Sequence, residues 1–228
     1  MLPINSQNDL GGHTMLKFSD TGKMPCKSWS LVALETCPAS KNADGSLVDA
    51  CAGCYATTGR YPMKNVKAPR EHNRIDWKRE DWVSDFVEAL DNDRYFRWFD
   101  SGDMYDLRLA NKILEVMKLT PWVNHWLPTR MHKFDKFAEV IAQMEALPNV
   151  VVRLSSDSID GETIEGVTTS TICHNVESAP EGAEVCLSYT RGGKCGTCRT
   201  CWSKDVPVVA YPAHGAKILK LIKVKVIK

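Results

Sequence analysis

The sequence predicts an α/β fold, either a partial (β/α) barrel or an open, mostly parallel sheet covered by helices. Three short segments rich in aromatic and β-branched residues predict strands, at residues 95–101 (YFRWFDS), 123–129 (VNHWLPT) and 150–156 (VVVRLSS). Their starts lie 28 and 27 residues apart, close to the length of a strand–helix–strand unit. Such alternation is typical of a parallel sheet, and three or four units are too few for an eightfold barrel.

Helices are predicted where apolar residues return every three or four positions. These residues are Val83, Phe86, Val87 and Leu90 in the first helix, Leu109, Ile113, Leu114 and Met117 in the second, and Phe134, Phe137, Val140, Ile141 and Met144 in the third. Asp103 or Asp106 is expected to cap the second helix, and Pro148 follows the third. Residues 221–228 partly alternate lysine with valine or isoleucine, which predicts a solvated edge strand or tail.

The chain of 228 residues is expected to form a single domain, 1–228. Its parts are a cysteine-rich N-terminal segment (1–60), strand–helix repeats (76–160), a cysteine-rich C-terminal segment (173–202) and a basic tail (217–228). The net charge of +1 gives no general attraction to nucleic acid or to membranes, so neither is expected as a partner. No apolar stretch has membrane-spanning length and the first residues lack a signal-peptide core, which predicts a cytoplasmic protein.

The nine cysteines gather near the two ends of the chain. In a reducing compartment they are expected to act as metal ligands or reactive groups rather than as disulfides. The two groups are Cys26, Cys37, Cys51 and Cys54 in the first quarter, and Cys173, Cys186, Cys195, Cys198 and Cys201 in the last. About 120 residues without cysteine separate them. The groups build two sites or meet in space.

The last three cysteines, Cys195, Cys198 and Cys201, stand at equal spacing of three residues. Closely spaced thiolates are typical of iron–sulfur clusters, whereas a zinc site usually draws two pairs of ligands from separate segments. Cys186 is the nearest fourth ligand. A structural zinc site and unliganded thiols are the alternatives. A [4Fe–4S] cluster is the principal prediction for this segment.

Cys37, Cys51 and Cys54 form a second candidate ligand set. The polar, turn-rich residues between Cys37 and Cys51 can loop out and leave the three thiols together. Three thiols on a four-iron cluster leave one iron open, and an open position distinguishes reactive from structural metal sites. In the alternative, this segment donates one or two ligands to a single C-terminal site. Cys26 and Cys173 lack a partner at ligand spacing and are expected to be buried.

Polar residues follow each predicted strand, at the edge where parallel α/β proteins bind ligands. We expect Asp100, Asp103 and Arg130 to be catalytic. The residues expected to contact a cofactor are Ser101, Gly102, Arg97, Arg153 and Ser155. Arg97 and Arg153 lie within strand-like segments, where a charge needs a partner or a ligand. Ordinary helix capping is the alternative explanation for the aspartates and serines.

Taken together, the segments CAGCYATTGRY, RWFDSGDMYD, WLPTR and GKCGTCRTCW, at residues 51–61, 97–106, 126–130 and 193–202, resemble the bacteriophage "gene product eighty-eight" family. The resemblance runs from about Gly22 to Trp202. It implies an iron–sulfur protein of phage origin, located in the host cytoplasm, and it supplies no reaction.

The N-terminal cysteine trio followed by strand–helix units also resembles radical S-adenosylmethionine enzymes. That resemblance implies a cluster on Cys37, Cys51 and Cys54, an S-adenosylmethionine amino group received near residues 101–103, a small-molecule substrate and an electron donor protein. The sequence departs from that pattern, because 13 residues separate Cys37 from Cys51 and Gly53 stands where an aromatic residue is usual. The alternatives are a non-enzymatic protein that transfers electrons or senses redox state, and a zinc-stabilised binding module.

Overall fold

The computed structural model describes residues 16–226, in which eight strands form one sheet of order β1-β2-β3-β4-β5-β6-β8-β7. The strands are β1 (Phe18–Asp20), β2 (Lys27–Trp29), β3 (Tyr95–Trp98), β4 (Asn124–Thr129), β5 (Val150–Ser155), β6 (Thr169–Cys173), β7 (Glu184–Val185) and β8 (Val208–Pro212). Only the β1–β2 pair is antiparallel. The predicted α/β class with a mostly parallel open sheet is therefore confirmed.

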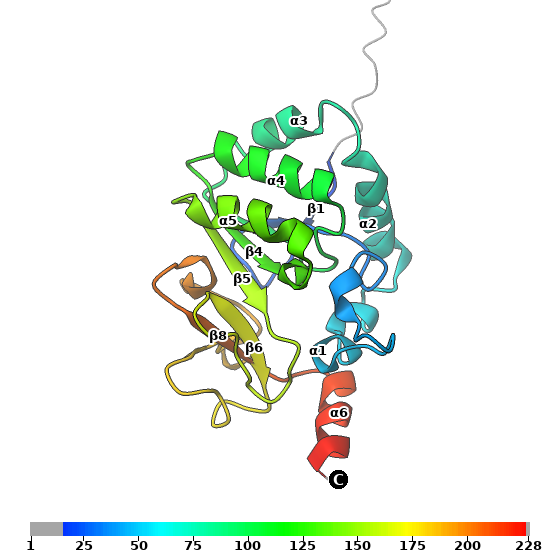
Figure 1. Cartoon of the computed structure of the whole chain (residues 1–228), viewed down its shortest axis with the longest axis vertical. Helices are drawn as coiled ribbons and strands as arrows, with labels where there is room; N and C mark the ends of the chain where they lie inside the picture. Colours follow the sequence, from blue (N-terminus) through cyan, green and yellow to red (C-terminus); the bar gives the residue numbers. More distant parts are fainter. Residues whose placement is uncertain (1–15, 227–228) are drawn as a thin grey trace, which may run out of the picture.

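Six α-helices accompany the sheet in the described part of the chain. They are α1 (Asp49–Ala52), α2 (Lys64–Asp76), α3 (Trp82–Ala89), α4 (Leu107–Leu119), α5 (Ala138–Ala146) and α6 (Ala216–Val226). Helices α3, α4 and α5 lie next to one another against the sheet, whereas α2, α1 and α6 follow along one side of the molecule (Figure 1). None of the described helices is long and apolar enough to cross a membrane.

The predicted strand–helix units match β3-α4-β4-α5-β5 with small shifts at their ends. Strand β3 stops at Trp98, so the polar residues from Asp100 onward lie in the loop after it. The carboxylate of Asp106 accepts a hydrogen bond from the Arg108 N–H, which identifies Asp106 as the cap of α4. Helix α5 begins only at Ala138, because two short 3₁₀ turns occupy the residues before it.

The prediction of an edge strand or tail for residues 221–228 is wrong for its described part, which belongs to the helix α6. Ile218, Leu221 and Ile222 recur at helical spacing, and they pack in one apolar cluster with Ala50 and Ile159. The lysines in and around this apolar stripe make its helical spacing hard to recognise in the sequence. Residues 227–228 lie outside the described part of the chain.

The core between α3 and the strands β2 and β3 is aromatic. Phe86 stacks on Trp98 with ring centres 4.8 Å apart, and Trp29 meets Trp82 edge-on at 5.4 Å. All four side chains are fully buried. Such rings each bury a large apolar area, so they fix the strands whose carboxyl ends carry the candidate site.

One polar chain crosses this core through His125 on β4. The Trp98 indole N–H donates to His125 Nδ1 (3.3 Å), and His125 Nε2 lies 2.9 Å from the Thr120 hydroxyl, which donates to the Val116 carbonyl. These directions place the ring proton on Nε2. Burial lowers the pKa of His125 from 6.5 to about 3, so the ring stays neutral in the folded protein.

We expect acid to destabilise the protein through His125. Since its folded pKa lies below its unfolded pKa, the unfolded state binds the extra proton as the pH falls from 6.5 towards 3. The contribution to the free energy of unfolding, fully present above pH 6.5, is lost across that window and amounts to roughly 4–5 kcal/mol. Urea unfolding of the parent and of His125→Gln at pH 7.5 and pH 4.5 checks this. An equal pH dependence in both proteins would contradict it.

Candidate functional site

A cavity of about 640 Å³ opens at the carboxyl ends of the parallel strands. Its walls come from the loops that follow β2, β3, β4 and β5 and from the strands β6 and β8. Cysteines of both groups lie on these walls, namely Cys37, Cys51, Cys54, Cys186, Cys195 and Cys201. The fold therefore brings the two cysteine-rich segments to one cavity, although the sequence separates them by more than a hundred residues.

The N-terminal trio lies on the long connection after β2. Cys51 sits on the short helix α1, and the Cys54 N–H donates to the Cys51 carbonyl (3.1 Å), which folds the pair into one turn. A Cβ atom at Gly53 would lie 2.9 Å from Ile218 Cγ1 of α6. Packing thus requires glycine at position 53, because the helix α6 contacts the turn that carries two of the thiols.

The trio thiols are protonated in the metal-free protein. Burial raises the pKa of Cys37 to about 12, and the nearby Asp103 carboxylate adds to the shift. Burial also raises the pKa of Cys51 and of Cys54, while the Arg130 guanidinium partly offsets both shifts. A metal that binds here must displace protons, so its affinity should rise with pH.

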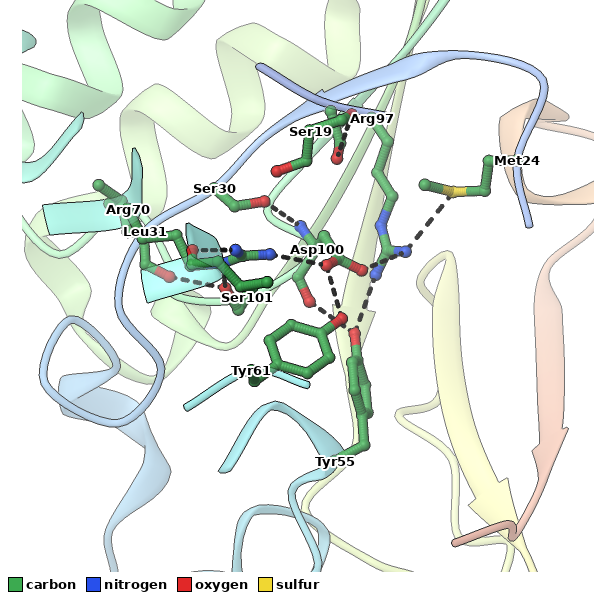
Figure 2. A network of polar contacts seen from close by, with 12 residues as sticks. Ser19, Met24, Ser30, Leu31, Tyr55, Tyr61, Arg70, Arg97, Asp100 and Ser101 are labelled. Carbon is green, nitrogen blue, oxygen red and sulfur yellow. Dashed lines mark hydrogen bonds and ion pairs between the residues drawn. The ribbon is translucent and has the colours of Figure 1, made fainter. Parts of the chain in front are cut away.

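Asp100, in the loop after β3, is the centre of a buried polar network (Figure 2). Its carboxylate accepts hydrogen bonds from the Tyr61 hydroxyl (2.6 Å), from Arg70 Nη2 (3.2 Å) and from Arg97 Nη1 (3.3 Å). Its carbonyl accepts one from the Tyr55 hydroxyl (2.5 Å). Three side-chain donors thus already contact this carboxylate, which the sequence predicts to be catalytic.

The network ties the trio to β3 through Tyr55, which directly follows Cys54 in the sequence. Arg97 Nη2 donates to the Tyr55 hydroxyl (3.4 Å), and the Arg97 guanidinium stacks on the Trp126 ring at 4.6 Å. Arg97 Nε and Trp126 Nε1 are buried and have no hydrogen-bond partner among the described residues. Two unpartnered N–H donors on adjacent strands therefore belong to residues of the cavity wall.

Asp103 is likewise held by the protein itself. Its carboxylate accepts from the Thr129 hydroxyl (2.7 Å), from the Arg130 N–H (2.9 Å) and from the Met104 N–H (2.8 Å). Burial nevertheless raises its pKa. These bonds fasten the end of β4 to the loop after β3, so Asp103 shapes the cavity wall.

Ser101 and Gly102 also shape this wall. The Ser101 hydroxyl donates to the Leu31 carbonyl (2.7 Å) and accepts from Arg70 Nε (2.7 Å). Gly102 has φ +81°, and a Cβ atom there would lie 2.5 Å from Leu31 Cβ and 2.7 Å from Thr36 Oγ1. The loop after β3 is thereby pressed against the loop that leads to Cys37.

Arg130 and Ser155 both line the cavity. Arg130 Nη2 donates to the Ser156 carbonyl (2.7 Å) and its Nε to Asp157 (3.2 Å), which leaves the guanidinium between the β4 and β5 loops and close to the trio. Arg153, in contrast, is fully buried and does not line the cavity. It projects from β5 towards the C-terminal cysteine segment.

Of the four remaining candidate ligands, Cys186, Cys195 and Cys201 line the cavity and Cys198 does not. Short polar contacts hold the sulfurs: Cys186 to the Ser188 hydroxyl (3.4 Å), Cys198 to the Thr200 hydroxyl (3.2 Å) and Cys201 to the Tyr211 hydroxyl (3.3 Å). The Cys195 N–H donates to the Lys23 carbonyl (2.8 Å), which anchors the segment next to β2.

The pKa values of Cys195, Cys198 and Cys201 shift in different directions. Burial raises the pKa of Cys195 and of Cys201. Burial also acts on Cys198, but hydrogen bonds from Thr200 and the nearby Arg191 outweigh it and lower the pKa of that thiol. Cys198 is thus more readily ionised than Cys195 and Cys201.

All nine cysteines are free, and Cys26 and Cys173 are buried as expected. Among the described residues, no three His, Cys, Asp or Glu side chains converge closely enough to hold a single metal ion. Six of the seven candidate ligands line one cavity.

Several wall and network residues escaped the sequence analysis, namely Tyr55, Tyr61, Arg70, Trp126 and Tyr211. Tyr55 carried a signal, since it adjoins Cys54. Arg70 carried none, because it lies on α2 in a polar stretch and reaches Asp100 only through the tertiary fold.

Comparison with known proteins gave one match, to a family model described as "Gene product 88", over residues 4–204. No curated protein and no solved structure matches the chain. The matched range contains all nine cysteines and the loops after β2, β3, β4 and β5. The chain belongs to the gene product 88 family.

Proposed function

We propose that this protein is an iron–sulfur enzyme in which Cys37, Cys51 and Cys54 hold a [4Fe–4S] cluster, and that it is similar in chemistry to radical S-adenosylmethionine enzymes. One observation carries the proposal: the three thiols share a cavity at the carboxyl edge of a parallel sheet. About 640 Å³ falls within the ~300–1,000 Å³ typical of small-molecule sites, so substrate and cofactor have room beside the thiols.

The donor set suits such a cluster. Thiolates are the usual ligands of iron–sulfur clusters, and the three trio thiols line the same cavity. Arg130 and Lys217 lie near the trio thiols, where their charge would offset that of the cluster.

The other residues of the cavity wall would bind the cofactor and substrate or hold the binding residues in place. When bound, the cluster would supply the electron for reductive cleavage of S-adenosylmethionine. Arg97 and Trp126 line the cavity, and the charge of the Arg97 guanidinium suits a carboxylate of the cofactor or substrate. Asp100 holds Arg97, while Asp103, Ser101 and Gly102 set the shape of the wall rather than offer free side chains. An electron donor protein is the partner that this chemistry requires.

Spectroscopy of anaerobically purified protein tests the proposal. We expect cluster-type absorption with iron and sulfide bound, and a change in the electron paramagnetic resonance spectrum of the reduced cluster when S-adenosylmethionine is added. Cys54→Ser should abolish that change, whereas Cys173→Ala, which removes a thiol buried away from the cavity, should preserve it. Stoichiometric zinc without iron would contradict the proposal. A cluster indifferent to S-adenosylmethionine would favour an electron-transfer protein.

A further inference from the structure

Arg153 on β5 is a buried cation with an unusual set of partners. It is fully buried, and no carboxylate among the described residues pairs with it. Its five N–H groups donate instead to five carbonyls, those of Thr169, Thr200, Cys201, Ser203 and Val206, at 2.9–3.4 Å. Four of these carbonyls belong to the single segment 200–206 that begins beside Cys201.

This arrangement calls for a negative group nearby. Moving a guanidinium from water into the protein interior costs several kcal/mol, and carbonyl dipoles offset only part of that cost. A buried cation is normally retained where an anion balances it. Among the described residues Arg153 is held by carbonyl dipoles, so a nearby anion would stabilise its charge further.

The groups near Arg153 that can become anionic are the Tyr211 hydroxyl and the Cys201 thiol. Cys201 shares its own carbonyl with Arg153 Nε (3.1 Å), and Cys195 and Cys198 precede it in the same loop. Gly192, Gly193 and Gly196 have φ values of +64°, +77° and +57°, which let this loop turn back on itself. Cys186 completes the group from the end of β7, and its N–H donates to the Ala210 carbonyl (2.8 Å) of β8.

Cys26 is close to this group but differs from it. It packs with Met24, Trp126 and Trp202 in the apolar cluster that Cys195 and Cys201 border. Unlike Cys186, it does not line the cavity, and it is buried. Cys186 interacts electrostatically with both Cys195 and Cys201, whereas Cys26 interacts with Cys195, which favours Cys186 as the fourth ligand and makes Cys26 a control for nonspecific loss of a thiol.

We propose that Cys186, Cys195, Cys198 and Cys201 hold a second iron–sulfur cluster, and that Arg153 is its positioning residue, which builds the ligand loop and balances the cluster's negative charge. With four thiolates this centre has no open iron, so it is suited to store or relay electrons rather than to bind substrate. The proposal rests on the proposed function only for the choice of iron and sulfide, since it concerns different ligands.

Iron and sulfide content per chain tests the ligand set. Relative to the parent, Cys198→Ser should lose roughly half of the iron, as should Cys54→Ser, while Cys26→Ala should lose none. The Cys198→Ser variant should retain the response to S-adenosylmethionine, so failure of one cluster is distinguishable from failure of the other. Full iron in Cys198→Ser, or zinc in place of the lost iron, would overturn the proposal.

Arg153→Lys and Arg153→Met test the positioning role. Arg153→Met should lose the same half of the iron as Cys198→Ser, and Arg153→Lys, which keeps the charge, should retain more of it. If Arg153→Met does not fold, Arg153→Lys still decides through thermal unfolding with and without bound metal. Metal should raise the melting temperature of the parent more than that of Cys198→Ser, with Arg153→Lys between them. An equal shift in all three proteins would refute the role of Arg153.

Discussion

Replacing Gly102 by alanine should destabilise the protein by roughly 2–5 kcal/mol and empty the proposed N-terminal cluster site. Overpacking costs ~1–3 kcal/mol and a left-handed backbone with a Cβ atom adds ~1–2 kcal/mol. Both apply here, because φ is +81° and the new methyl would lie 2.5 Å from Leu31 Cβ. Leu31 cannot retreat easily, since it is fully buried and begins the connection that leads to Cys37.

A matched control separates the two costs. Gly45 has nearly the same φ, +85°, but nothing lies within 4 Å of a Cβ atom built there. Gly45→Ala should therefore cost only the ~1–2 kcal/mol of backbone strain. Chemical unfolding of both variants gives the free energies, and iron analysis gives the occupancy. Similar losses of stability in the two variants would show that the contact with Leu31 is not decisive.

Asp100→Asn should have an effect of similar size, roughly 3–5 kcal/mol, because it removes the one carboxylate shared by two buried arginines. The side chains of Asp100, Arg70 and Arg97 are 6%, 8% and 14% exposed, so water cannot replace the lost charge. The asparagine amide can still accept the hydrogen bond from Tyr61, but it carries no charge to balance either guanidinium. We also expect weaker binding of an anionic ligand, since Arg97 would lose its fixed orientation.

Asp93→Asn is the comparison for this second prediction. Asp93 pairs with Lys27 at 2.8 Å, but the lysine side chain is 45% exposed, and such surface pairs contribute about 0–1 kcal/mol. Urea unfolding of both variants measures the difference. The prediction about the buried network would be wrong if Asp100→Asn were no more destabilising than Asp93→Asn.

The regular middle of the fold could be predicted from sequence because its signals are local. Short aromatic and β-branched segments predict the strands β3, β4 and β5. Apolar residues at helical spacing predict the helices α3 and α4. Strands β1, β2 and β7 have only two or three residues, too few for any periodicity. Helix α6 was misread because lysines alternate with its apolar residues, and only packing against Ala50 and Ile159 decides the matter.

Part of the cavity wall could be predicted from the sequence, but the residues that support it could not. Cysteine spacing selected seven thiols, and six of them line the cavity. Asp100 and Asp103 were also selected, yet their partners Tyr61, Arg70 and Thr129 lie 26 to 39 residues away in sequence. Arg153 was expected to contact a cofactor because a charge within a strand needs a partner. Its five backbone carbonyl partners have no sequence signature at all.

Because cysteines from both ends of the sequence line the cavity, its walls are synthesised at different times. Cys54 leaves the ribosome roughly 130 residues before Cys186, which at ~5–20 residues per second is a delay of about 7–26 seconds. During that interval the trio loop lacks the C-terminal part of the cavity wall and the helix α6 that presses on Gly53. The enclosed site can form only after residues 186–226 have been made, so a metal delivered earlier would meet an exposed loop and one delivered later a finished cavity.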